Sequence, residues 1–249
     1  MLKELVPFAS PSPLPIRPGS RITVFAPHPD DESLGTGGLI QQALAVGARV
    51  RVIFPTDGDN NPWPQRFLER RIFINADCRK RWGARRRNEA LRALEKLGLN
   101  PDDAVFFGLP DQGLLPMWRE RNADTTDAFV RTVKAWPADV VVVPSPRDQH
   151  PDHRGTYLFA MEALLQAQQN PAIYSYLIHP GFFRRYAQGT ALSLTPEQRA
   201  AKLQAILCHE TQVALSRRRF CSYAGEEEIF TPEPLPETSP ARQPAIPVG

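Results

Sequence analysis

Hydrophobic and polar positions alternate with two different periods along residues 19–230, and these periods predict strands and helices in turn. Short apolar runs rich in β-branched residues predict strands, whereas apolar residues spaced three and four apart predict helices. The expected strands cover residues 21–26, 49–54, 104–107, 139–143 and 173–178, and the expected helices cover residues 37–46, 85–97, 124–135, 155–168 and 196–215. Strands that alternate with helices favour βαβ units. We therefore expect an α/β fold with a Rossmann-like three-layer αβα arrangement and a mostly parallel sheet.

The two ends of the 249-residue chain lack this periodicity. Five prolines between residues 7 and 18 predict an extended lead-in over residues 1–18, and residues 231–249 form a Pro-rich, apolar-poor tail. The single folded domain is thus expected at 19–230. No apolar run approaches the ~20 residues that span a bilayer, so we expect no integral membrane segment. The three cysteines share no CxxC spacing, which favours a reducing compartment and a cytoplasmic protein.

The formal net charge is only +3, but the basic side chains are unevenly spread. Many of them fall in one segment: Arg66, Arg70, Arg71, Arg79, Lys80, Arg81, Arg85, Arg86 and Arg87. Such a cluster can be a nucleic-acid surface, a solvated helix face or the rim of a pocket for an anionic small molecule. No nucleic-acid motif accompanies the charges, so we favour the last two. Residues 60–84 also lack a clean period and are predicted to form an insertion over the site.

Two clusters of histidine and aspartate follow two of the expected strands. His28-Pro29-Asp30-Asp31-Glu32 comes after residues 21–26, and His150-Pro151-Asp152-His153 comes after residues 139–143. Chemistry in an open α/β sheet collects beyond the carboxyl ends of its strands. Imidazole and carboxylate are ligands of catalytic zinc, and two histidines with one carboxylate also suit iron. If the fold brings the clusters together, they form a metal site with a base and an acid beside it.

Each cluster also has a purely structural interpretation. An Asp-Asp-Glu run at a helix start can serve as a cap and compensate the helix dipole, and a lone histidine at a strand end is commonly structural. The glycines of Gly35-Thr36-Gly37-Gly38 lack the spacing of a phosphate loop. His179 is expected to be structural or to line a pocket. Trp63, Trp82 and Trp118 are candidates either for stacking on a sugar ring or for plain packing.

Several further motifs accompany the two clusters in an ordered series. The series reads Ala26-Pro27-His28-Pro29-Asp30-Asp31-Glu32, Gly37-Gly38, Thr56-Asp57-Gly58, Arg86 with Glu89-Ala90, Gly108-Leu109-Pro110-Asp111, His150-Pro151-Asp152-His153, Lys202 to Ala205 and His209-Glu210-Thr211-Gln212. In these motifs, residues 20–230 resemble the PIG-L/LmbE-like family of zinc-dependent N-acetylglucosaminyl deacetylases. Pro27 is a small departure, since alanine is common there. The resemblance implies a hydrolase that removes an N-acetyl or other N-acyl group from an amino-sugar conjugate.

The resemblance also implies a role for each matched position. His28, Asp31 and His153 would bind the zinc ion, and Asp30 would be the general base. His150 would be the protonated group that stabilises the oxyanion or supplies a proton to the leaving amine, and Asp152 would orient His150 and favour its charge. Arg86 and Asp111 would contact the sugar, and His209 would face the site.

Two other functions fit the same residues. One is a metal-dependent esterase or phosphoesterase, although a two-metal phosphoesterase needs more ligands than these clusters supply. The other is a catalytically silent sugar-binding protein, which would have no need of Asp30 and His150. The expected partner is a small amino-sugar conjugate, with an anionic group suggested by the arginines, and a homo-oligomer is left open.

Overall fold

The computed structural model describes residues 14–180 and 189–237. Most of the expected lead-in and the last 12 residues of the expected tail lie outside these ranges. Within them, no helix combines the length and apolarity needed to cross a bilayer.

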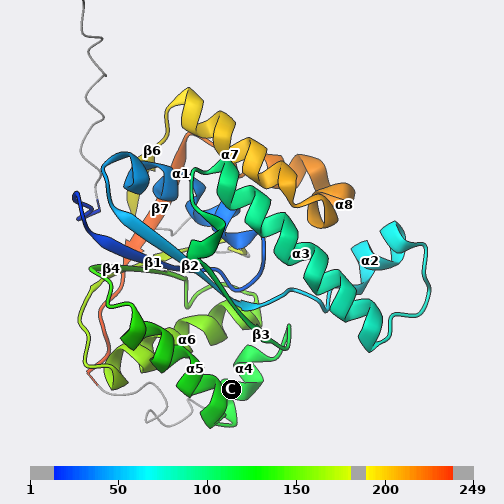
Figure 1. Cartoon of the computed structure of the whole chain (residues 1–249), viewed down its shortest axis with the longest axis horizontal. Coiled ribbons are helices and arrows are strands. Elements are labelled where there is room, and N and C mark those ends of the chain that lie inside the picture. Colours follow the sequence, from blue (N-terminus) through cyan, green and yellow to red (C-terminus); the bar gives the residue numbers. More distant parts are fainter. Residues whose placement is uncertain (1–13, 181–188, 238–249) are drawn as a thin grey trace, which may run out of the picture.

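A seven-stranded sheet forms the centre of the fold, in the order β3-β2-β1-β4-β5-β7-β6 (Figure 1). The strands are β1 (Arg21–Phe25), β2 (Arg49–Thr56), β3 (Ala104–Leu109), β4 (Val140–Pro144), β5 (Ala172–Tyr176), β6 (Thr190–Ser193) and β7 (Glu227–Pro232). The first five are parallel, whereas β7 runs antiparallel to both β5 and β6. The predicted mostly parallel sheet is confirmed.

Helices cover both faces of this sheet. They are α1 (Asp31–Ala45), α2 (Pro62–Glu69), α3 (Ala76–Lys96), α4 (Leu114–Arg119), α5 (Ala123–Ala135), α6 (Pro151–Gln166), α7 (Pro196–Cys208) and α8 (Glu210–Cys221), and a 3₁₀ turn covers Pro101–Asp103. Figure 1 shows α1, α3 and α7 on one face and α4, α5 and α6 on the other. The predicted three-layer αβα architecture is therefore confirmed.

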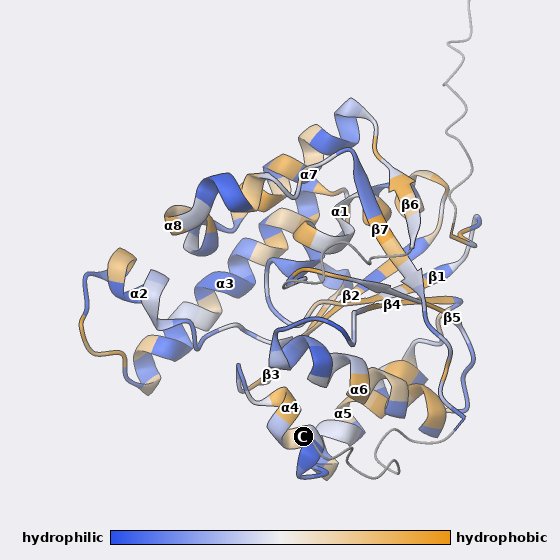
Figure 2. Cartoon of the chain, turned by 180° about the vertical axis from the view of Figure 1, so that it is seen from behind, coloured by the Kyte–Doolittle hydropathy of each residue, from blue (hydrophilic) through white to orange (hydrophobic). Residues whose placement is uncertain are grey.

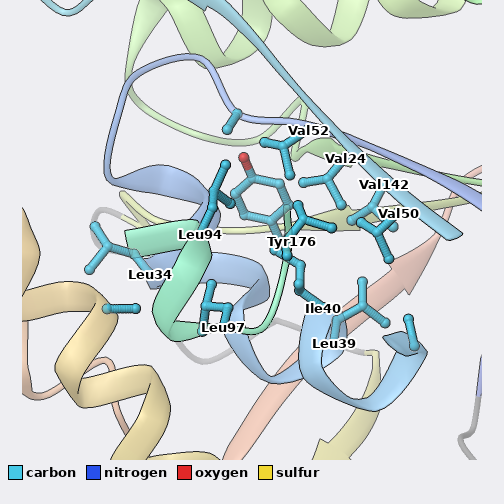
Figure 3. Close-up of a cluster of buried hydrophobic side chains, with 14 of the residues drawn as sticks. Val24, Leu34, Leu39, Ile40, Val50, Val52, Leu94, Leu97, Val142 and Tyr176 are labelled. Atoms are coloured by element: carbon cyan, nitrogen blue, oxygen red, sulfur yellow. The ribbon is translucent and has the colours of Figure 1, made fainter. Parts of the chain in front are cut away.

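The core divides into two apolar clusters because side chains of a strand alternate between the faces of the sheet. In β4, Val140 and Val142 belong to the cluster under α1 and α3, whereas Val141 and Val143 belong to the cluster under α5 and α6. Figure 3 shows the first cluster, in which Ile40 and Leu94 meet the valines of the sheet. The apolar colour of the strands in Figure 2 shows why a continuous apolar run was a sound strand signal.

Helix α1 begins at Asp31, six residues before its predicted start at residue 37. Two glycines in these first turns serve close packing. A Cβ atom on Gly35 would lie 2.3 Å from Tyr176 Cδ2, and one on Gly38 would lie 2.1 Å from Leu194 Cδ2. The earlier start places Asp31 in the first helical turn instead of a loop.

The expected insertion at 60–84 is mostly helical. It contains α2 and the first turns of α3, which begins at Ala76 instead of residue 85. The Asn75 side chain caps α3 by accepting a hydrogen bond from Cys78 N at 2.9 Å. The exposed arginines hid the apolar periodicity of these turns.

The C-terminal part differs from prediction in three respects. The expected helix 196–215 is two helices, α7 and α8, because the backbone breaks at His209 (φ −81°, ψ 59°). The strands β6 and β7 were not predicted, and β7 crosses the expected domain boundary at residue 230 to end at Pro232. β6 is the edge strand and β7 lies next to it, and both are partly exposed, so they lack a continuous apolar run.

Candidate functional site

The two predicted clusters meet at one edge of the sheet. β1 pairs with β2 on one side and with β4 on the other, so the strand order reverses between β1 and β4. In open α/β sheets, the crevice for a ligand forms at this switch point. The loops after Phe25 and Pro144 lie side by side here, and the His28 and His153 rings are 5.5 Å apart between centroids.

Three predicted metal ligands face one another at this point. Asp31 Oδ2 lies 3.1 Å from His28 Nδ1 and 3.2 Å from His153 Nε2. Ligand atoms of a tetrahedral zinc ion, with bonds of about 2.0–2.1 Å, stand roughly 3.3 Å apart. His153 Nε2 is buried and has no hydrogen-bond partner, so one atom of this set is left for a ligand that the chain does not supply. The two spacings to Asp31 thus suit a divalent metal ion, and His28 and His153 also form, with His150, a group whose possible ligand atoms lie within 4.8 Å of one another.

The outer nitrogens of both imidazoles face carboxylates. His28 Nε2 lies 3.2 Å from Asp111 Oδ1 and 3.2 Å from Asp152 Oδ2, and His153 Nδ1 lies 3.0 Å from Asp148 Oδ2. Carboxylates in this position orient metal-binding imidazoles. Burial opposes a charge on either ring, but the carboxylates outweigh it, raising the pKa of His28 above its ordinary value and that of His153 to about 9.

Asp148 was missed by the sequence reasoning, although it contacts much of the site. The carboxylate is fully buried and accepts backbone hydrogen bonds from His150 (2.9 Å), Ile178 (3.1 Å) and His179 (3.0 Å). It thereby ties the loop after β4 to the end of β5 and fixes the His153 ring. The sequence signal that could have identified Asp148 is its position two residues before His150, in the same loop as the predicted cluster.

The predicted base, Asp30, is held in a strained conformation beside Arg86. Its φ of 142° is rare for any residue with a side chain, and its backbone N–H donates to Glu32 Oε2 at 2.9 Å. Arg86 lies 3.3 Å from Asp30 Oδ2 and donates to the carbonyls of Pro29 and Gly58, each at 2.6 Å. Burial raises the pKa of Asp30 to about 6, against the opposing charge of Arg86.

His150 and Asp152 differ from their expected relationship. The Asp152 carboxylate accepts from the backbone of Gln112 (2.6 Å) and Leu114 (3.0 Å), and it is the Asp152 backbone N–H that donates to His150 Nδ1 at 3.2 Å. Burial, with the charges of His28 and His153, lowers the pKa of His150 to about 4. Because Nδ1 accepts this backbone hydrogen bond, a neutral His150 would carry its proton on Nε2, and the expected role of His150 as a cation stays a prediction.

A cavity of about 450 Å³ opens onto this cluster. Arg86 and Asp111 line it, together with Trp63 and Gln212, and their contact with a sugar stays a prediction. His209 is absent from the described lining, which corrects its expected place. It is buried behind α1, with Nε2 at 2.8 Å from Glu32 Oε1.

A larger cavity of about 1120 Å³ adjoins the first one. Both are lined by Ile178, His179, Arg219 and Tyr223, so the site has room beyond one sugar ring. His179 is therefore a pocket residue. Trp82 and Trp118 instead serve packing: the Trp82 side chain is fully buried, and Trp118 meets Phe159 edge-on with ring centroids 5.3 Å apart.

Comparison with known proteins identifies curated relatives of this chain. A curated relative, 1D-myo-inositol 2-acetamido-2-deoxy-alpha-D-glucopyranoside deacetylase from Mycolicibacterium smegmatis, is 29% identical over 162 residues, which are 60% of this chain and 54% of that protein. The chain thus spans about half the length of the curated relatives it matches.

Solved structures share the fold. N,N'-diacetylchitobiose deacetylase from Pyrococcus horikoshii superposes with a TM-score of 0.63 at 22% identity, covering 86% of this chain and 84% of that one. The 4-carboxy-2-hydroxymuconate hydratase from Pseudomonas putida superposes with a TM-score of 0.62 at 19% identity, covering 86% and 95%. The fold therefore accommodates more than one reaction, and the assignment of function depends on the site.

The family comparison covers both clusters. The sequence pattern of the PIG-L family, described as GlcNAc-PI de-N-acetylase, matches residues 23–164, which include every residue of the His28 and His150 clusters. This is more than half of the chain, and the resemblance expected from the motifs is confirmed. The chain belongs to the PIG-L family.

Proposed function

We propose that this protein is a metal-dependent N-deacetylase of amino-sugar conjugates, with zinc as the metal and iron(II) as the alternative. The observation that carries the proposal is the position of Asp30, a strained and buried carboxylate beside the triad of His28, Asp31 and His153. The curated relatives support the substrate class, since their names describe deacetylases of acetamido sugars.

In this proposal, the triad holds the ion and Asp30 handles protons. When bound, a zinc ion would supply Lewis acidity, which lowers the pKa of water towards ~7 and polarises an amide carbonyl. Asp30, with its pKa raised to about 6, is suited to remove a proton from water near neutral pH and to return it to the departing amine. Arg86 keeps that carboxylate at the cavity through its contacts with Pro29 and Gly58.

His150 is proposed to stabilise the oxyanion as a neutral donor. Its Nδ1 accepts the Asp152 backbone N–H, which leaves the proton on Nε2. A fixed donor of this kind stabilises charge that develops on a carbonyl oxygen. Arg86 and Asp111 are proposed to contact the sugar.

The larger cavity is proposed to take the group attached to the amino sugar. Arg219 lines both cavities and would pair with an anionic group there. The three cysteines, Cys78, Cys208 and Cys221, are free, which supports a place in the reducing cytoplasm. A homo-oligomer remains a prediction.

Release of primary amine from a panel of N-acetyl sugars tests the proposal. The panel includes acetylglucosaminyl-inositol and N,N'-diacetylchitobiose, and the enzyme is loaded with zinc or with iron(II). Asp30→Asn is expected to reduce the rate by about 10²- to 10⁴-fold while zinc still binds. Full activity of this variant would overturn the role of Asp30. Ester or phosphoester cleavage without amine release would favour the esterase alternative, and sugar binding without turnover would favour the silent binder.

A further inference from the structure

A projection beside the site carries exposed apolar side chains. Figure 1 shows α2 and the start of α3 extending away from the body of the molecule; we call residues 62–81 the α2–α3 projection. The four most exposed large apolar side chains among the described residues all lie here: Phe73 (87%), Ile72 (77%), Trp63 (72%) and Phe67 (65%). Exposed apolar groups in such a cluster mark an interaction surface.

Helix α2 of the projection is anchored to α3 and presents one face outward. Trp63 and Phe67 are four residues apart on the outer face of α2, whereas Pro64 and Gln65 are buried on the inner face. Gln65 Nε2 donates to Cys78 O at 2.7 Å, which ties α2 to α3. Trp63 and Phe67 are therefore held outward while their helix is anchored, and Ile72 and Phe73 lie exposed in the loop between α2 and α3.

The same segment concentrates positive charge. It has two acidic side chains, Glu69 and Asp77, and six basic ones: Arg66, Arg70, Arg71, Arg79, Lys80 and Arg81. All six basic side chains are exposed. The net charge of the projection is thus +4, whereas the whole chain has +3 and the remaining residues together have −1. Figure 2 shows hydrophilic and apolar colours side by side along the projection.

We propose that the α2–α3 projection binds the surface of an anionic lipid bilayer. Tryptophan and phenylalanine on one face with arginine and lysine around them are the composition of interfacial helices, and basic side chains near an anionic leaflet add to binding. The proposal is independent of the reaction at the metal site.

Charge complementarity favours this partner over two others. A second copy of the chain across a two-fold axis would bring the same net positive surface against itself. A nucleic-acid duplex would match the charge, but its bases are stacked inside and leave Ile72 and Phe73, which are 77% and 87% exposed, in water; an unpaired base could stack on Phe73 but not bury Ile72. An anionic bilayer matches both the positive charge and the exposed apolar side chains of the projection.

The position of Trp63 links the surface to the site. This side chain is 72% exposed and also lines the smaller cavity. A bilayer in contact with the projection would therefore lie beside the cavity mouth.

Vesicle flotation tests the proposal with the full chain. The probes are vesicles of phosphatidylcholine alone and of phosphatidylcholine with a third of phosphatidylglycerol. The wild type is expected to float only with the anionic vesicles and to be released by salt. Ile72→Ser/Phe73→Ser should reduce binding at least roughly tenfold, and Arg79→Gln/Lys80→Gln roughly thirtyfold.

Matched controls lie on α5 and just after α1. Arg131→Gln/Lys134→Gln removes two exposed charges, and Val46→Ser removes one exposed apolar side chain; both should bind vesicles as the wild type does. Circular dichroism establishes that each variant is folded. Absence of binding to anionic vesicles, or binding unchanged by both projection variants, would overturn the proposal. So would a smaller oligomer for Ile72→Ser/Phe73→Ser without lipid, or tighter binding to a DNA duplex than to vesicles.

Discussion

Two buried groups of charges lie against the same helix, α1, and they differ in how completely their atoms are matched. In the middle of the helix, Lys202 Nζ lies 2.6 Å from Glu228 Oε1, and the Glu228 carboxylate also accepts the backbone N–H groups of Gly38 (2.7 Å) and Leu39 (2.9 Å). At the first turn, Asp31 stands between two imidazoles, and His153 Nε2 has no hydrogen-bond partner.

The difference separates a structural charge group from a functional one. The Lys202–Glu228 pair is closed, since each charge meets its opposite and the spare oxygen is satisfied. The Asp31 cluster combines an unmatched buried nitrogen with a strained neighbour, Asp30. Both groups lie at a cavity wall, since Lys202 and Glu228 line the larger cavity and Asp30 and Asp31 the smaller one, so these two features are what distinguish them. Unsatisfied buried atoms and backbone strain are costly and are retained mainly where a ligand or a reaction uses them.

The closed pair should give the largest effect when one partner is removed. Lys202→Met leaves the buried Glu228 carboxylate without its cation, so we expect the free energy of unfolding to fall by about 3–5 kcal/mol. Urea denaturation measures this loss. Lys202→Met/Glu228→Gln should recover part of it, because the unpaired charge is gone. A loss below about 1 kcal/mol in the single variant would show that the pair does not stabilise α1.

The Asp31 cluster (His28, Asp31 and His153), which we call the open cluster, should instead gain stability from a metal ion. Zinc at 100 times its dissociation constant should raise the free energy of unfolding by about 2.7 kcal/mol. Denaturation with zinc and with a chelator gives the difference, and in His153→Ala it should nearly vanish. An equal gain in this variant would place the ion elsewhere.

Asp148 should affect the open cluster through His153 and through the backbone N–H groups that it accepts from His150, Ile178 and His179. Asp148→Asn keeps the size of the side chain but removes the charge that faces His153 Nδ1 at 3.0 Å. We expect zinc affinity to fall about 10- to 100-fold, or about 1.4–2.7 kcal/mol. Competition with a chromophoric chelator measures the affinity. Unchanged affinity would mean that the ring is fixed by packing alone.

The sequence predicted which histidines and aspartates meet at this site better than it predicted their surroundings. His28, Asp31 and His153 could be found because each follows an apolar run, and such a run needs little context to be identified as a strand. Asp148 could not be assigned so directly, since its partners Ile178 and His179 follow the end of β5, 30 and 31 residues later. The orientation of Asp152 likewise depends on the backbone of Gln112 and Leu114.

The fold shows the same division between local and distant causes. The buried strands β1 and β4 were predicted within one residue, because burial on both faces requires a continuous apolar run. The start of α1 was misplaced, because the reason for Gly35 and Gly38 lies in Tyr176 and Leu194, which are distant in the sequence. Tertiary contacts override helix propensity at such positions.

His209 and Glu32 support the open cluster from behind, and their pair should make stability depend on pH. Burial lowers the pKa of His209, but Glu32 at 2.8 Å outweighs it, so the pKa is raised above its ordinary value. The pair then stabilises the fold fully below the unfolded pKa of about 6.5, and this contribution is lost as pH rises through the folded pKa. We expect a loss of about 1.5 kcal/mol, the lower end for a charged hydrogen bond, since a neutral one can remain.

Unfolding of the wild type and His209→Gln at several pH values isolates this contribution. The difference between the two proteins should be largest at pH 6 and shrink towards alkaline pH. A difference that stays constant or grows with pH would mean that His209 is neutral in the folded protein.

An ion pair near the surface should contribute least to the free energy of unfolding. It therefore tests how much the burial of a charged pair matters. Arg87 Nε lies 2.5 Å from Asp57 Oδ1, a shorter contact than the Lys202–Glu228 pair, but the two side chains are 38% and 21% exposed. Water screens such a pair, so Arg87→Gln should cost only about 0.2–1 kcal/mol, and high salt should remove most of the difference. Urea denaturation at low and high salt measures both. If Arg87→Gln lost as much free energy of unfolding as Lys202→Met, then the distance between the charges, and not their burial away from water, would determine how strongly an ion pair stabilises this protein.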